Sequence, residues 1–208
     1  MTTMDQPLRR MLDDEEMKTV EKAFSDAGYP VNLLLGVRPW VAGLFLSSSS
    51  CQVDSLAAGL KPLDLLVSDA AKAGSIQLVG LEDLVEQYEA LASIPDEVQG
   101  AWLRASIEMH DRVDDVTHTI VELYRFRRLP AVWELTREMA PRAKLTDDIL
   151  REIQDGLIRR RNPRMLERSL PLIQAGSAFI AVGAMHLSGS DGLVAMLETK
   201  GFTLVAVE

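Results

Sequence analysis

Three short apolar segments constrain the fold of this chain more than any other feature: Ile76–Val79, Ala178–Val182 and Phe202–Val207. Continuous apolar runs of this length are typical of strands that are covered on both faces. Between the second and third segments, residues 191–200 have the apolar spacing of a helix, and Gly201 follows as its expected stop. A strand, a helix and a strand in close succession predict a right-handed crossover between parallel strands. We therefore expect a small parallel sheet.

The rest of the chain has the periodicity of helices. Apolar residues spaced three or four positions apart predict an amphipathic helix over residues 17–27. Another helix is expected over about residues 38–50, with Pro39 early enough to lie in its first turn. The longest helical stretch covers residues 96–128 and ends before Pro130. Helices therefore account for most of the predicted structure.

Together these elements predict the fold class α/β (α+β by content). We expect one domain over residues 1–208, in which a small parallel sheet carries a large helical insertion at residues 96–175. Three strands are few for a sheet, and uncovered edges invite pairing with another chain. The sequence therefore predicts self-association, by edge pairing or by exchange of helices such as Asp96–Arg128.

Composition and charge exclude several classes of protein. The net charge of −9 argues against nucleic acid as the main partner. One cysteine, Cys51, excludes an intrachain disulfide and a multi-cysteine zinc site. No apolar stretch approaches the length of a membrane span. Residues 1–18 lack the apolar core of a signal peptide, so the chain as written is expected to be soluble and unexported. A chain trimmed at its N-terminus would look the same, which leaves the compartment open, the cell envelope included.

His186 and Glu82 each follow a predicted strand. Ligands bind beyond the carboxyl ends of the strands in parallel sheets. His186 comes after Ala178–Val182 and the turn residue Gly183, and Glu82 comes after Ile76–Val79, so we expect both side chains at one edge of the sheet. Two other interpretations stay open: a loop histidine that bonds a neighbouring carbonyl, and a carboxylate stabilised at a helix N-terminus.

The remaining polar residues have simpler interpretations. Asn162, directly before Pro163, is suited to be a helix N-cap. His110 and His118 lie eight residues apart on a helical stretch, too far to share a metal ion without other ligands. Among the neighbouring arginines, four are expected to form a solvated basic face and Arg161 is the exception: Arg159, Arg160, Arg164 and Arg168.

Several short motifs, in order along residues 38–208, resemble the TraB/GumN family, also called TraB/PrgY/GumN, to which the Tiki proteases are related. The most informative motif is Gly183-Ala-Met-His186. An apolar segment comes before it, and a glycine-rich loop, a helix and a final apolar segment follow it. The other matching residues are Arg38 to Trp40, Asp64, Glu82, Gln87, Arg161, Asn162 and Met165.

The resemblance implies a metal-dependent hydrolase of the Tiki-like kind. In that interpretation His186 is a metal ligand for Mn²⁺, Co²⁺ or Zn²⁺, and Glu82 is a second ligand or a general base. Arg161 would stabilise a developing negative charge. The resemblance does not identify a substrate or ligand, which could be a peptide, a polysaccharide or another protein.

One departure from the family pattern weakens the catalytic interpretation. Family members carry a first Gly-x-x-His upstream of these motifs, and this chain has none, because neither His110 nor His118 follows a glycine three residues earlier. One imidazole and one carboxylate make a poor site for a hydrolytic zinc ion, which takes three protein ligands. Two hypotheses follow: a hydrolase-like domain that is inactive as this chain, or a non-catalytic binding module that shares the fold alone.

Overall fold

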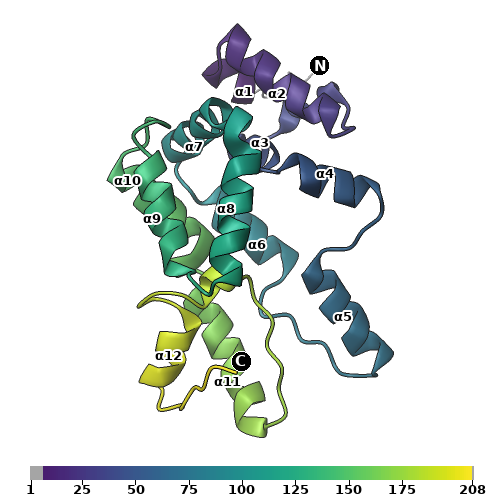
Figure 1. Ribbon diagram of the computed structural model, residues 1–208, viewed down its shortest axis with the longest axis vertical. Coiled ribbons are helices and arrows are strands. Elements are labelled where there is room, and N and C mark those ends of the chain that lie inside the picture. The colour runs from purple at the N-terminus through teal and green to yellow at the C-terminus, as the bar shows by residue number, and fades with distance from the viewer. Residues whose placement is uncertain (1–6, 208) are drawn as a thin grey trace.

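The computed structural model describes residues 7–207, a succession of α-helices joined by short helical turns and extended coil (Figure 1). Figure 1 shows the N-terminal helices at one end of the molecule and α11 and α12 at the other. No helix in the described range is long and apolar enough to cross a membrane. The α-helices are α1 (Pro7–Met11), α2 (Asp14–Asp26), α3 (Pro39–Leu46), α4 (Ser50–Ala57), α5 (Leu63–Ala73), α6 (Leu84–Ala92), α7 (Asp96–Glu108), α8 (Val113–Arg125), α9 (Pro130–Met139), α10 (Asp147–Gln154), α11 (Asn162–Ala175) and α12 (Leu193–Thr199). The described residues also form the 3₁₀ helices η1 (Val31–Gly36), η2 (His110–Arg112) and η4 (Ala184–His186), and the π-helix η3 (Asp155–Arg159).

The predicted parallel sheet is wrong, because residues 7–207 contain no β-strand. The three apolar segments are extended coil, and no backbone hydrogen bond among the described residues joins one segment to another. Many of their side chains face solvent: Phe179 is 82% exposed and Val205 is 80% exposed. A strand needs a neighbouring strand to pair its backbone N–H and C=O groups. An apolar pattern gives no information on whether that neighbour exists, so the described chain is all-α where the sequence predicts α/β.

The largest core lies among the N-terminal helices. Helix α2 begins with a capping box, in which Asp13 accepts from the Glu16 backbone N–H and the Glu16 side chain accepts from the Asp13 backbone N–H. Its apolar face packs on α3 and α7, where Gly43 of α3 allows a close approach to Leu103. We call this set of buried side chains the N-terminal core: Leu8, Leu12, Met17, Val20, Phe24, Leu34, Ala42, Leu46 and Leu103.

A smaller apolar cluster positions the chain just before the candidate site. Ile94, Val98 and Ile153 are buried between α6, α7, α10 and η3. A Cβ on Gly156 would lie 2.5 Å from Cγ1 of Ile94, so only glycine allows η3 to pack this closely. Helix α10 therefore continues through a wide turn that leads to Arg161.

A third contact region joins the segment at residues 81–86 to helix α11. Leu81 and Val182 pack on the buried Met165, Leu166 and Leu193 of α11 and α12. The polar contacts across the same boundary form what we call the Glu–Arg junction, made of Glu82, Glu86, Arg161, Arg164 and Arg168. This junction joins residues 82–86 to Arg161 and helix α11, although the two segments are far apart in the sequence.

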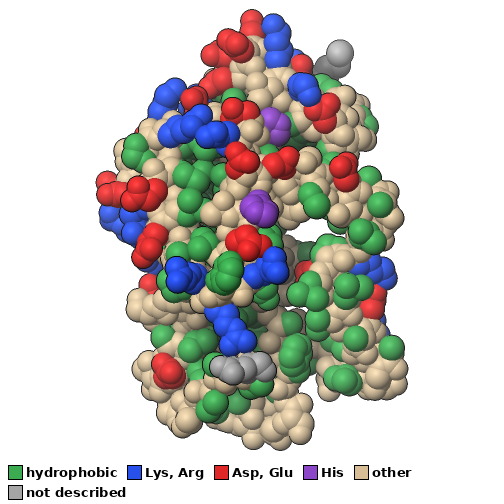
Figure 2. All heavy atoms as spheres, in the orientation of Figure 1, with side chains coloured by type: hydrophobic (Ala, Val, Ile, Leu, Met, Phe, Trp, Pro, Cys, Tyr) green, Lys and Arg blue, Asp and Glu red, His purple; other side chains and the backbone are tan. Residues whose placement is uncertain are grey.

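Helices α4 and α5 form an arm with little packing. Neither helix contains a buried residue, and Leu63 and Leu66 of α5 are 69% and 51% exposed. Figure 2 shows open space between the part of the surface that belongs to this arm and the rest of the molecule. The arm therefore leaves an apolar helix face in solvent.

Candidate functional site

Glu82 and Arg161 form a buried, bidentate ion pair. Nη2 of Arg161 donates to Oε2 of Glu82 at 2.6 Å, and Nε lies 3.0 and 3.1 Å from the two carboxylate oxygens. Nη1 of Arg161 donates to the Leu157 carbonyl at 2.9 Å. The Glu82 side chain is 2% exposed and that of Arg161 18%. Glu82 lies before α6, whose cap is Asp83, so its charge is balanced by Arg161 and not by a helix N-terminus.

The neighbouring pair, Glu86 and Arg168, lies nearer the surface. Arg168 donates to both oxygens of Glu86 at 2.6 and 2.7 Å, and also to the Leu81 carbonyl. The bonds from Arg168 and from the Asp83 backbone N–H lower the pKa of Glu86 to about 2. The arginines are partly exposed, as predicted. Ion pairs also hold them in place, so a basic face that contacts solvent alone describes them incompletely.

His186 is buried and bonded to Asn162. Nδ1 of His186 lies 2.6 Å from Oδ1 of Asn162. Nδ2 of Asn162 donates to the Asp191 carbonyl at 2.6 Å and to the His186 carbonyl at 3.4 Å. Asn162 is fully buried and makes no capping bond, because the N-cap of α11 is Arg161. The prediction that Asn162 is an N-cap is wrong. In the sequence, the signal that pointed to a different role was the family motif formed by Arg161, Asn162 and Met165.

The surroundings of His186 favour its neutral form. Burial lowers the pKa of His186, the positive charge of Arg161 lowers it further, and Glu82 opposes this effect. An imidazole with a lowered pKa is uncharged at neutral pH. His186 therefore has one nitrogen that carries a lone pair.

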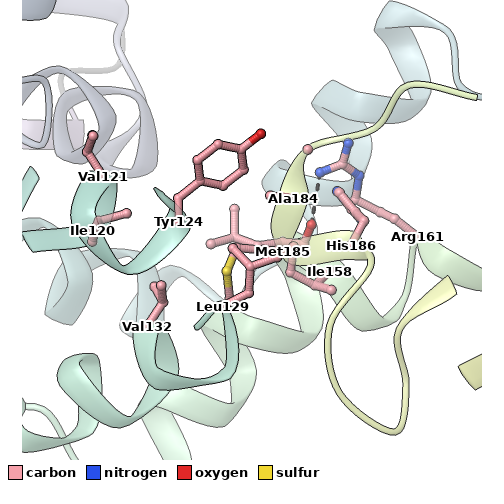
Figure 3. A pocket seen from close by; sticks show the side chains of 12 residues that line it. Ile120, Val121, Tyr124, Leu129, Val132, Ile158, Arg161, Ala184, Met185 and His186 are labelled. Atoms are coloured by element: carbon pink, nitrogen blue, oxygen red, sulfur yellow. Dashed lines mark hydrogen bonds between the residues drawn. The ribbon is translucent and has the colours of Figure 1, made fainter. Parts of the chain in front are cut away.

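A cavity of about 430 Å³ lies beside His186, between α8 and α9 on one side and η3 and η4 on the other. Figure 3 shows Arg161 and His186 together at one side of this pocket, with Ile120, Val121 and Tyr124 across from them. Apart from the hydroxyl group of Tyr124, the other side chains of the wall are apolar. The lining residues are Ile120, Val121, Tyr124, Leu129, Val132, Leu157, Ile158, Arg161, Gly183, Ala184, Met185 and His186.

The described residues do not form a metal site. Within residues 7–207 no group of three or more His, Cys, Asp or Glu side chains is placed to hold a metal ion. Both oxygens of Glu82 accept from Arg161, which leaves His186 as the ligand with a free nitrogen. The two other histidines do not line its pocket: Nδ1 of His110 lies 3.1 Å from the Leu46 carbonyl, and His118 is exposed on α8. A hydrolytic metal with three protein ligands does not fit this arrangement.

The structure thus brings Arg161 and His186 to one pocket and places Glu82 on Arg161, although the sheet edge that was expected to gather them is absent from the described residues. The roles predicted for the three residues stay predictions. In a comparison with known families, residues 1–206 match the model of the TraB/PrgY/gumN family. No curated protein and no solved structure matches the chain.

Proposed function

Because this chain belongs to the TraB/PrgY/gumN family, with a mostly apolar pocket whose polar side chains are His186, Arg161 and Tyr124, we propose that it is a non-catalytic binding domain. The pocket takes up an apolar group of a ligand, and His186 contacts a polar atom next to it. Apolar walls with a small number of placed polar groups are typical of ligand pockets.

The bonding of Glu82 supports binding without hydrolysis. A general base must reach the proton that it removes. Both carboxylate oxygens of Glu82 are already bonded to Arg161, and the side chain is 2% exposed. Glu82 therefore stabilises the structure and keeps the charge of Arg161 balanced beside the pocket.

Filling the pocket tests this proposal. Ala184→Leu adds three carbon atoms to the pocket wall, and Ala181→Leu adds the same atoms at an exposed position outside the pocket. With p-cresol as the probe, NMR titration should show shifts at the Met185 methyl group in the unchanged protein and in Ala181→Leu, and at least tenfold weaker binding in Ala184→Leu. Equal binding by both variants would show that the probe does not enter this pocket.

The metal-dependent hydrolase is the second candidate, and the bonding of His186 favours it. Histidines that bind metals donate their other ring N–H to a fixed acceptor, and here Nδ1 of His186 lies 2.6 Å from the Asn162 amide oxygen. At least two further ligands would have to come from outside residues 7–207, from a further segment or a second chain.

Calorimetric titration with Zn²⁺, Mn²⁺ and Co²⁺ separates the two candidates. We expect weak binding by the 208-residue chain, lost in His186→Ala and nearly unchanged in His118→Ala, with no hydrolase activity. Tight stoichiometric binding that survives His186→Ala would place a metal site elsewhere in the chain.

A further inference from the structure

The amide of Asn162 can be oriented in one way only. Its nitrogen lies 2.6 Å from the Asp191 carbonyl and 3.4 Å from the His186 carbonyl, and both carbonyls accept hydrogen bonds. Reversing the amide would place its oxygen against two other acceptors. The Asn162 oxygen therefore lies toward Nδ1 of His186, at 2.6 Å.

This orientation decides which nitrogen of His186 carries the proton. An amide oxygen accepts and does not donate, so Nδ1 must donate and hold the hydrogen. In a neutral imidazole the other nitrogen, Nε2, then carries the lone pair. Nε2 has no hydrogen-bond partner within residues 7–207. It is also not one of the unbonded side-chain nitrogen and oxygen atoms in that range that are completely closed off from solvent. His186 lines the pocket, so this acceptor is open to a ligand.

We propose that Asn162 is a positioning residue that holds His186 in the Nδ1–H tautomer, and that the pocket selects apolar ligands bearing an uncharged hydrogen-bond donor, a hydroxyl or an amide N–H. The ligand class rests on the binding function proposed above. A donor satisfies Nε2, whereas an ether or ketone leaves this acceptor facing another acceptor. A carboxylate is disfavoured as well, because Glu82 already balances the charge of Arg161.

The tautomer is tested first on the unchanged protein by ¹⁵N NMR of its imidazoles. The chain has 3 histidines, and a His186→Gln variant assigns the signals of His186. We expect a pyridine-like Nε2 and a pyrrole-like Nδ1 for His186 at neutral pH, with the exposed His118 as a solvent reference. A pyrrole-like Nε2 would overturn the proposal.

One variant then shows whether Asn162 sets the tautomer. Asn162→Leu has a similar size and offers Nδ1 no acceptor. In Asn162→Leu we expect the proton to move to Nε2. An unchanged pattern in a folded Asn162→Leu protein would show that other contacts set the tautomer.

Matched probes test the ligand class. p-Cresol and 4-methylanisole share one ring and differ at the oxygen, which carries a hydrogen in p-cresol and a methyl group in 4-methylanisole, and p-toluate carries a carboxylate. We expect p-cresol to bind roughly fivefold more tightly than 4-methylanisole, with p-toluate weakest, as one net hydrogen bond predicts. Equal binding of the first two, with the expected tautomer in place, would overturn the ligand class. If neither binds, the binding function itself fails, and the NMR pattern still decides the role of Asn162.

Discussion

The N-terminal helices and the region around α11 are held together by different forces. The N-terminal core is apolar, with Val20, Ala42 and Leu103 fully buried. Around α11, the buried apolar cluster is small, and the Glu–Arg junction and the bonds of Asn162 join the segments, while the apolar segments nearby lie in solvent. Apolar sequence alone therefore does not decide where packing occurs, and around α11 polar contacts join segments that are far apart in the chain.

The largest effect is expected from breaking the buried ion pair. Glu82→Gln leaves the guanidinium of Arg161 without its counter-charge, and removal of one partner of such a pair costs about 3–5 kcal/mol. Urea unfolding followed by circular dichroism measures this loss. Asp69→Asn, which breaks the exposed pair with Lys61, is the control, and its cost should be much smaller because water screens an exposed pair. Similar small losses in both variants would contradict the claim that polar contacts hold this region.

A pair of identical substitutions compares the two regions directly. Val20→Ala removes two methyl groups from the N-terminal core, where the side chain is fully buried, and should cost about 2 kcal/mol. Val205→Ala removes the same groups from a side chain that is 80% exposed and should stay within about 0.5 kcal/mol. Equal losses in urea unfolding would mean that the segment containing Val205 is packed in solution.

The exposed apolar side chains also lead us to propose self-association. Phe179 is 82% exposed, Val207 88% and Leu63 69%, and exposed apolar surface can form contacts with a second copy. Sedimentation velocity over a range of concentrations should show reversible dimers, and Phe179→Ser should weaken them roughly fivefold. Lys18→Ser, on the exposed face of α2, is the control. A strict monomer at high concentration would count against this proposal.

The smallest effect concerns pH. The pKa of His186 is lowered in the folded protein, so below its unfolded value, 6.5, the unfolded chain binds more protons. His186 therefore contributes stability above pH 6.5 that is lost as the pH falls toward the folded pKa. Urea unfolding at pH 7.5 and 5.5 should show a larger loss for the unchanged protein than for His186→Gln. Equal losses would indicate that His186 is solvated.

Local signals in the sequence gave reliable predictions where a few neighbouring residues decide the structure. Met17, Val20 and Phe24 are buried on one face of α2, as their spacing predicts. Pro39 lies in the first turn of α3. The helix expected over residues 96–128 is interrupted at η2, which separates α7 from α8.

Predictions that depend on distant partners were less successful. The βαβ unit requires strands that pair, and the apolar runs around α12 find none within residues 7–207. The helix expected from residue 191 begins at Leu193 instead. Arg161 and Glu82 were singled out by their resemblance to family motifs, but nothing in the sequence indicated that they bond to each other. The bond between Asn162 and His186 likewise depends on how η4 packs against α11, which local spacing does not specify.

The bond between Arg161 and Glu82 also bears on the order of folding, because it joins residues 79 positions apart. Closing a long loop has an entropic cost before any contact within it stabilises the chain, and contacts of large sequence separation slow folding. The N-terminal helices can pack during synthesis before residue 161 has left the ribosome. The pocket cannot, because one of its walls comes from residues 183–186. We expect a chain that ends before residue 161 to fold its first helices and to lack the pocket, so binding by His186 would report that nearly the whole chain has folded.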